Sequence, residues 1–290
     1  MIANHPGVST GTVASRDGGL VVMADLPERY LELLRLCLTR EFPEPAYAEI
    51  PRNTRTWLKA ARYAGYSATQ RALRPFNLAV VQKNRSTGET MMGMGALNNL
   101  HFCMHEVVKH RVPGDFVETG VWRGGGTIYM RGFLAAYAEP DRNVWVADSF
   151  EGLPKPKAEY EADRGSQLWA SEYLAVSVDQ VKAHFEFYGL LDDRVRFLKG
   201  FFSDTMPTAP IEQIALLRLD ADMYESTIVV LDHLYPKLSR GGYVIIDDYG
   251  MLPECNRAVE DYRAGQRIVE PLEIIGYVNG NPLGAYWRKG

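Results

Sequence analysis

Apolar segments of two kinds alternate along the chain after residue 113. Short apolar runs without helical spacing predict β-strands, whereas longer segments with apolar residues three and four positions apart predict α-helices. The predicted strands cover residues 115–121, 144–150, 195–201, 214–222 and 243–249. The predicted helices cover residues 126–137 and 171–188, a segment from the end of the fourth strand to residue 238, and residues 254–266. This alternation is typical of an α/β protein with a parallel sheet.

The last part of the chain departs from this alternation. Residues 272–277 and 284–288 are short runs, and the turn-forming sequence Asn279-Gly280-Asn281 lies between them. The pattern predicts an antiparallel hairpin rather than another crossover. We therefore expect an α/β fold with a doubly wound sheet that ends in an antiparallel hairpin. This arrangement is similar to that of class I methyltransferases, whereas dehydrogenase domains usually keep the last strand parallel.

The hydrophobic pattern divides the chain into three parts. Residues 1–20 show no apolar periodicity and no signal-peptide pattern, so we expect a flexible leader. Residues 21–112 are predicted to form a helical N-terminal segment, with helices at 27–39 and 91–109. Residues 113–290 form the predicted catalytic domain. His101 and His105 have a spacing that could chelate a metal, but without a third ligand nearby a packing or surface role is favoured.

The bulk composition narrows the class of protein. Of the 290 residues, 46% are apolar and 23% are charged, as in a soluble globular protein. A net charge of −4 and a pI near 5.9 give no basic surface for nucleic acid. No apolar run reaches the roughly 18 residues of a membrane span. Three widely spaced cysteines, Cys37, Cys103 and Cys255, indicate a reduced, cytoplasmic protein rather than a disulfide framework.

Two of the predicted strands end in pairs of carboxylates, namely Asp220, Asp222, Asp247 and Asp248. Ligands bind beyond the carboxyl ends of the strands in an open parallel sheet, so the four side chains should share one crevice. Carboxylates that close repel one another unless a cation neutralises them, and no Lys lies among them. One strand-end Asp would usually cap the following helix. Two pairs on successive strands instead favour a hard ion, Mg²⁺ first and then Mn²⁺ or Ca²⁺.

A glycine-rich turn follows the first predicted strand. The sequence Glu118-Thr119-Gly120-Val121-Trp122-Arg123-Gly124-Gly125-Gly126 opens a helix where backbone must approach a ligand closely. Its spacing does not match the dinucleotide fingerprint G-x-G-x-x-G, but it resembles the S-adenosylmethionine motif. The second strand ends near Asp148, which can accept hydrogen bonds from both hydroxyls of a ribose. Asp148 alone could cap a turn, but beside the glycine turn it favours ribose binding.

The chain closely resembles the macrocin O-methyltransferase family in six segments: VETGVWRGGG, VWVADSFEGLP, YGLLDDRVRFLKGFFSDT, LRLDADMYEST, YPKLSRGGYVIIDDYG and AVEDYR. The resemblance extends from about residue 27 to the C-terminus. Members of this family methylate sugar hydroxyls of macrolide, aminocoumarin and related natural products, and they use S-adenosylmethionine and Mg²⁺.

This resemblance implies roles for individual residues. The methionine end of the cofactor would be held by Glu118, Thr119, Gly120, Gly124 and Gly125, and its ribose and adenine by Asp148, Ser149 and Phe150. The resemblance also implies metal ligation by Asp220, Asp247 and Asp248. Thr90 and Met91 match a Thr-Met pair that closes over the cofactor from the N-terminal segment.

The expected chemistry follows from the poor nucleophilicity of a neutral sugar hydroxyl. Binding of that hydroxyl and a vicinal one to Mg²⁺ lowers the pKa of the alcohol and fixes the line of attack. Asp222 points the same way as Asp220 on an extended strand, so Asp222 is our candidate general base. Alternatively, Asp222 could itself be a metal ligand, or it could contact the metal ligands without touching the metal. A nicotinamide (NAD)-dependent oxidoreductase is disfavoured by the glycine spacing and the four carboxylates. An inactive S-adenosylmethionine-binding scaffold is disfavoured because all four aspartates are present.

Differences from the family gather where the acceptor should lie. They fall in residues 42–99 and 160–173, and residues 42–87 are rich in Arg and aromatic side chains. We therefore predict that these segments choose the acceptor glycoside and that the N-terminal segment forms a lid over it. Four apolar residues could cover a hydrophobic aglycone or pack in the core: Met92, Met94, Leu168 and Trp169. The apolar surface of helices 27–39 and 91–109 also predicts a homo-oligomer, at least a dimer.

Overall fold

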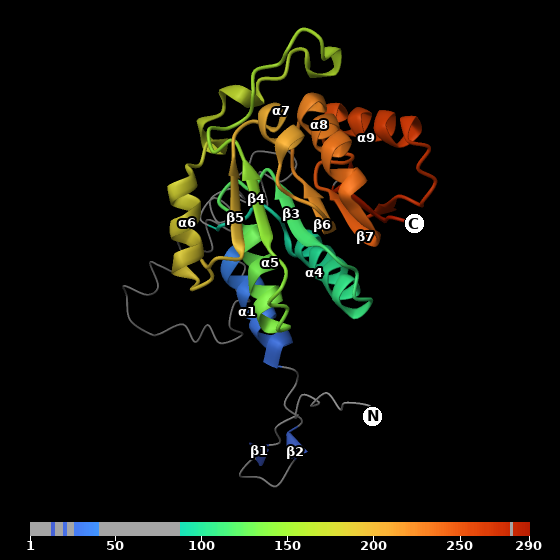
Figure 1. Ribbon diagram of the computed structural model, residues 1–290. Coiled ribbons are helices and arrows are strands. Elements are labelled where there is room, and N and C mark those ends of the chain that lie inside the picture. The colour runs from blue at the N-terminus through green and yellow to red at the C-terminus, as the bar shows by residue number, and fades with distance from the viewer. Residues whose placement is uncertain (1–12, 15–19, 22–25, 41–87, 279–280) are drawn as a thin grey trace, which may run out of the picture.

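The structure, a computed structural model, describes residues 13–14, 20–21, 26–40, 88–278 and 281–290. Its centre is a seven-stranded sheet in the order β5-β4-β3-β6-β7-β11-β8 (Figure 1). The first five of these strands pair in parallel: β3 Asp115–Thr119, β4 Val144–Asp148, β5 Val195–Lys199, β6 Ile214–Leu219 and β7 Leu238–Ile246.

The terminal hairpin completes this sheet. The strand β11 (Ala285–Arg288) runs antiparallel to both of its neighbours, β7 and β8 (Glu273–Ile274). The predicted doubly wound sheet with an antiparallel terminal hairpin is therefore confirmed. A smaller hairpin of β9 (Tyr277–Val278) and β10 (Asn281–Pro282) lies between β8 and β11 in the sequence.

The central strands are apolar on both faces because helices cover both faces of the sheet. Every residue of β6 is buried, and its side chains are shared between two hydrophobic clusters, with Leu216 in one and Leu217 in the other. The first cluster is covered by α1 (Leu26–Thr39), α4 (Met94–Lys109), α5 (Gly125–Ala136) and α6 (Val178–Phe187). The second is covered by α8 (Tyr224–Leu234) and α9 (Pro253–Gly265), which lie together in Figure 1.

The two N-terminal helices contribute to the core of the sheet. Their leucines at helical spacing are buried in the first cluster, and Met92 and Met94 pack in or against the same cluster. The alternative in which these two methionines pack in the core is therefore the one observed. His101 Nδ1 lies 2.8 Å from the hydroxyl of Tyr129, and its other nitrogen faces Glu28 at 3.4 Å, which confirms a packing role for this histidine.

Several predicted boundaries were wrong, each for a local reason. The helix predicted at 171–188 begins only at Val178, because Ser177 and Gln180 form a capping box there and a 3-10 turn, Glu172–Leu174, precedes it. The strand β7 begins five residues earlier than residue 243, because it continues through an irregularity that shifts its register against β6. The strand β6 ends at Leu219, so the residues up to 222 belong to a loop.

Two predictions concern segments that are largely outside the described residues. Of the leader 1–20, the structure describes β1 (Val13–Ala14) and one residue of β2 (Leu20–Val21), which pair as a two-stranded hairpin. Residues 42–87 of the predicted lid lie outside the described part of the chain. Among the helices that are described, none is long and apolar enough to cross a membrane.

Candidate active site

A pocket open to solvent lies where β3, β4, β5 and β6 end, with about 710 Å³ of empty space that includes the solvent at its mouth. Six of the predicted site residues line this pocket: Met91, Gly120, Asp148, Ser149, Asp220 and Asp222. The other predicted residues are not in its lining, namely Thr90, Glu118, Thr119, Gly124, Gly125, Phe150, Asp247 and Asp248.

The glycine turn brings backbone against the neighbouring strand end. Gly120 has a φ of +81°, and a Cβ at this position would overlap the carbonyl oxygen of Asp220. Gly125 donates its backbone N–H to the carbonyl of Glu89 at 2.8 Å, so the segment that carries Thr90 and Met91 packs directly on the turn. Thr90 is buried, whereas Met91 is 43% exposed and faces the pocket. The predicted Thr-Met pair therefore lies beside the glycine turn.

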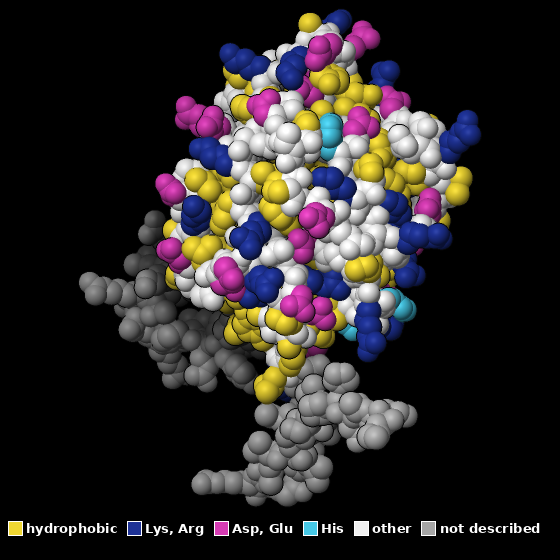
Figure 2. Space-filling model, viewed as in Figure 1, with side chains coloured by type: hydrophobic (Ala, Val, Ile, Leu, Met, Phe, Trp, Pro, Cys, Tyr) yellow, Lys and Arg dark blue, Asp and Glu magenta, His cyan; other side chains and the backbone are white. Residues whose placement is uncertain are grey.

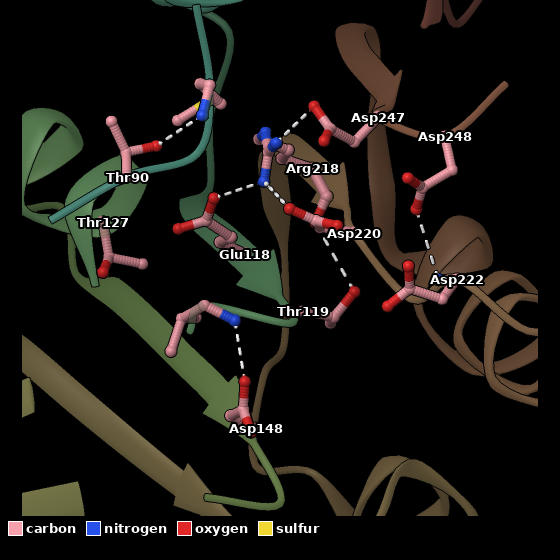
Figure 3. Close-up of polar contacts among 12 residues, drawn as sticks. Thr90, Glu118, Thr119, Thr127, Asp148, Arg218, Asp220, Asp222, Asp247 and Asp248 are labelled. Carbon is pink, nitrogen blue, oxygen red and sulfur yellow. Dashed lines mark hydrogen bonds and ion pairs between the residues drawn. The ribbon is translucent and has the colours of Figure 1, made fainter. Parts of the chain in front are cut away.

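Asp148 connects the ends of the first two parallel strands. Its carboxylate accepts a hydrogen bond from the backbone N–H of Val121 at 2.8 Å (Figure 3) and another from the backbone N–H of Phe150 at 2.7 Å. Burial raises the pKa of Asp148, and these backbone donors oppose the rise. The side chain of Phe150 packs in the core near Phe197, so Phe150 supports the site through its backbone. Asp148 thus lies in the pocket, and the backbone of the glycine turn orients its carboxylate.

Three of the four predicted acids form a cluster. Carboxylate oxygens of Asp220, Asp222 and Asp248 all lie within 4.8 Å of one another. Burial raises the pKa of each, and that of Asp222 reaches about 6, with a further contribution from the negative charge of Asp247. Asp222 has a φ of +57° in a loop, so the strand-alternation argument for its direction was wrong. Its carboxylate nevertheless reaches the cluster.

The fourth acid, Asp247, pairs with a residue that the sequence reasoning missed. Arg218 lies buried in β6 and forms ion pairs with Asp247, with Asp220 at 3.1 Å and with Glu118 at 2.6 Å (Figure 3). The signal available in the sequence was a single charge within the otherwise apolar run 214–219. The crevice therefore contains a cationic side chain. The single positive charge of this guanidinium does not balance the four aspartates and Glu118.

The residues present fit both groups that the fold and the family imply. The Glu118 carboxylate is buried beside Gly126, burial raises its pKa to about 7, and its Oε2 has no hydrogen-bond partner among the described residues. The ammonium of a methionine moiety is a suitable donor for such an oxygen. The clustered aspartates offer only hard oxygen ligands, as Mg²⁺ prefers.

The wall of the pocket near α8 contains further residues that were not predicted. Glu225 is buried, and its carboxylate pairs with Lys157 from the segment between β4 and α6. The same segment supplies Asp163, whose carboxylate caps α8 by accepting from the backbone N–H of Tyr224 at 2.6 Å and of Glu225 at 2.9 Å. In Figure 1 this yellow-green segment arches over one end of the sheet. These contacts fix it against the pocket.

A second group of unpredicted residues gives the pocket its apolar character. The lining includes Trp122, Leu153, Pro154, Leu174, Phe201 and Phe202. Phe201 and Phe202 follow β5, and α7 (Phe202–Thr205) begins there. Their position after a third parallel strand was the signal that could have found them, because the carboxyl ends of parallel strands share one edge.

The strand order, the glycine turn after β3 and the acid after β4 define a class I methyltransferase, a fold that implies S-adenosylmethionine as the methyl donor. The model of the macrocin O-methyltransferase family matches residues 27–289. The chain belongs to this family, as its sequence motifs predicted, and is an O-methyltransferase. Family membership removes the support for the oxidoreductase alternative.

Two relatives illustrate the match in sequence. The chain is 49% identical over 206 residues to demethyldecarbamoylnovobiocin O-methyltransferase of Streptomyces niveus, covering 70% of this chain and 77% of the relative. It is 46% identical over 223 residues to mycinamicin III 3''-O-methyltransferase of Micromonospora griseorubida, covering 73% of this chain and 85% of the relative.

Solved structures agree with the fold. The O-methyltransferase NovP superimposes with a TM-score of 0.73 at 42% identity, covering 91% of this chain and 99% of NovP. The calicheamicin methyltransferase CalS11 has a TM-score of 0.55 at 22% identity, covering 78% of this chain and 92% of CalS11, and supports the fold alone.

Proposed function

We propose that this protein is a Mg²⁺-dependent enzyme that moves a methyl group from S-adenosylmethionine to a sugar hydroxyl of a glycosylated natural product, such as a macrolide or a similar antibiotic. The observation that carries the proposal is the pocket itself. It brings the glycine turn, Asp148 and two acids of the carboxylate cluster to one opening. Relatives that are 46–50% identical to the chain are named for methyl transfer to glycosylated antibiotics or their sugars.

The pocket wall contains both apolar and hydrogen-bonding side chains, which supports a glycoside as the acceptor. Aromatic and aliphatic side chains occupy part of the lining and suit an apolar aglycone, whereas Glu225 and Ser226 offer hydrogen-bonding groups for sugar hydroxyls. Trp169, which could cover an aglycone or pack in the core, is 37% exposed, lies under the ammonium of Lys155 at 4.8 Å and is not in the lining of the pocket. Asp163 and Lys157 hold this segment to α8, so acceptor-contacting side chains here would be positioned by buried contacts.

Each predicted site residue has a separate role in the proposed reaction. Gly120 and Asp148 would hold the cofactor beside the acid cluster, and Met91 would cover it from the N-terminal side. Asp220 and Asp248, which lie in the oxygen cluster, and Asp247, whose carboxylate also pairs with Arg218, would hold the cation, which would lower the pKa of the acceptor hydroxyl. Asp222 accepts the proton of that hydroxyl as methyl transfer proceeds. Aligning the acceptor oxygen with the methyl group is expected to supply a large share of the acceleration, about 7–11 kcal/mol in favourable cases.

Methyl transfer in the presence and absence of a chelator tests this proposal. The purified protein is incubated with methyl-labelled S-adenosylmethionine and a panel of under-methylated macrolide and aminocoumarin glycosides. We expect label on a sugar hydroxyl of at least one glycoside, no transfer in excess EDTA, and recovery when Mg²⁺ is added back, because the acids cluster without enough positive charge. Full transfer in excess EDTA would contradict the proposed dependence on a divalent cation. Absence of transfer to any sugar would contradict the proposal that the acceptor is a glycoside.

We also propose a cytoplasmic homo-oligomer. The apolar face of α4 is used by the core, but α1 keeps Leu26, Tyr30 and Leu33 exposed. Apolar side chains are visible at the lower end of the molecule, where α1 lies, and charges of both signs are mixed over the rest of this face (Figure 2). Light scattering should give at least twice the 32.6 kDa mass of one chain. Charged substitutions at Leu26 and Leu33 should lower that mass, and a single-chain mass for the unaltered protein at every concentration would contradict the proposal.

A further inference from the structure

Arg218 is the penultimate residue of β6, and its side chain is almost completely enclosed, with 2% of it exposed. Its neighbours along the strand, Leu217 and Leu219, pack in the hydrophobic cluster on the other face of the sheet. A guanidinium in such surroundings is stable only when carboxylates pair with it. The identity of those carboxylates therefore indicates what the arginine does.

Three carboxylates at the ends of three neighbouring strands surround this guanidinium (Figure 3). Nη1 donates to Glu118 Oε1 at 2.6 Å and to Asp220 Oδ2 at 3.1 Å, and Nη2 forms an ion pair with Asp247. Glu118 lies directly opposite Arg218 in the parallel register of β3 and β6. Glu118 is the acid next to the glycine turn, whereas Asp220 and Asp247 belong to the acidic crevice. One side chain thus contacts both halves of the site.

The geometry of an arginine makes these contacts interdependent. Its donors point in fixed directions within one plane, so a shift of one carboxylate changes the geometry available to the others. Asp220 is the residue in common, because its carboxylate contacts Arg218 and also belongs to the oxygens that could hold a cation. An ion that fixes Asp220 would thereby help to fix Arg218 and, through it, Glu118.

We propose that Arg218 is a positioning residue that couples the two halves of the site, so that the cofactor and the divalent cation strengthen each other's binding. This inference rests on the proposed function, in which both are bound. Both the cofactor and the cation bind to a site in which Glu118, Arg218 and Asp220 are ordered. Whichever ligand binds first orders these side chains, so the second ligand binds with a smaller entropic cost. The coupling is reciprocal, because each ligand must change the affinity of the other by the same factor.

Calorimetry with the complete chain measures this coupling without any acceptor. The probes are S-adenosylhomocysteine and Mn²⁺, and the quantity is the ratio of the two Kd values for S-adenosylhomocysteine, in excess EDTA and in saturating Mn²⁺. We expect a ratio of about 5 or more for the unaltered protein. Arg218→Met should bring the ratio to about 1. Arg218→Lys should give an intermediate ratio, because a lysine keeps the charge but lacks the planar fork.

The ratio distinguishes positioning from simpler effects of the substitution. Removing a positive charge would by itself strengthen the binding of Mn²⁺. A general loss of stability would weaken the binding of both Mn²⁺ and S-adenosylhomocysteine, but it would not change the ratio of the two Kd values for S-adenosylhomocysteine. The matched control is Arg142→Met, which removes an arginine that pairs with Glu139 and donates to the carbonyl of Gly114, at the opposite end of the strands. This variant should keep the ratio of the unaltered protein. If Arg218→Met does not fold, Arg218→Lys carries the test.

Each outcome has a separate meaning. A ratio of 1 for the unaltered protein, or an unchanged ratio in the Arg218 variants, overturns the coupling and leaves the proposed function standing. Failure of the unaltered protein to bind S-adenosylhomocysteine at all would instead overturn the proposed function, and the coupling with it.

Discussion

Gly120→Ala is expected to abolish cofactor binding and to destabilise the fold by about 3 kcal/mol or more. Two effects act at this position. The φ of +81° is one that a residue with a side chain rarely adopts, and the new methyl group would overlap the carbonyl oxygen of Asp220. Backbone cannot rotate away as a flexible side chain can, so β3 and β6 would have to separate where the glycine turn meets the acid cluster.

A matched substitution separates these two effects. Gly189 also has a positive φ, +65°, but a Cβ there would have no neighbour within 4 Å. Gly189→Ala should therefore carry only the cost of the backbone conformation, about 1–2 kcal/mol, and keep cofactor affinity. Urea unfolding gives the stability of both variants, and calorimetry with S-adenosylhomocysteine gives their affinity. Equal losses in the two variants would show that the contact with Asp220 does not matter.

The parts of the fold that could be predicted are those with local signals. The strand β6 and the last residues of β7 are mostly apolar because both faces of the sheet are covered, and the glycine turn must follow a strand to bring backbone to a ligand. Paired aspartates at the ends of adjacent strands then had to come together at one edge. These regularities are sufficient to locate the cofactor turn and the acid cluster.

The contacts that complete the site could not be predicted, because they join residues far apart in the sequence. The charge of Arg218 is visible in the sequence, but its partner Glu118 is 100 positions earlier and faces it only through strand register. Asp163 lies in a 3-10 turn with no periodic signal, and the helix that it caps begins 61 residues later. Asp222 was placed correctly for the wrong reason, since the chain leaves β6 before reaching it.

Asp222→Asn is expected to lower kcat by about 10²–10⁴-fold, the usual contribution of a general base, and to leave cofactor affinity unchanged. The amide has a similar size but cannot accept the proton of the acceptor hydroxyl. Burial and the nearby charge of Asp247 raise the pKa of Asp222 to about 6. A base must be ionised, and a cation bound beside Asp222 would lower this pKa, so the rate of the Mg²⁺-loaded enzyme should fall only at a pH below about 6. The residual rate of the variant should lack this acid limb.

Binding of Mn²⁺ decides between a base and a ligand at this position, because Asp222 lies in the same oxygen cluster as Asp220 and Asp248. If Asp222 is the base, Asp222→Asn should bind Mn²⁺ nearly as well as the unaltered protein, while the matched variant Asp220→Asn should lose most of its affinity. Electron paramagnetic resonance of free Mn²⁺ measures both variants. Comparable losses of Mn²⁺ affinity in the two would make Asp222 a ligand, and the proton of the acceptor would then have to be accepted elsewhere.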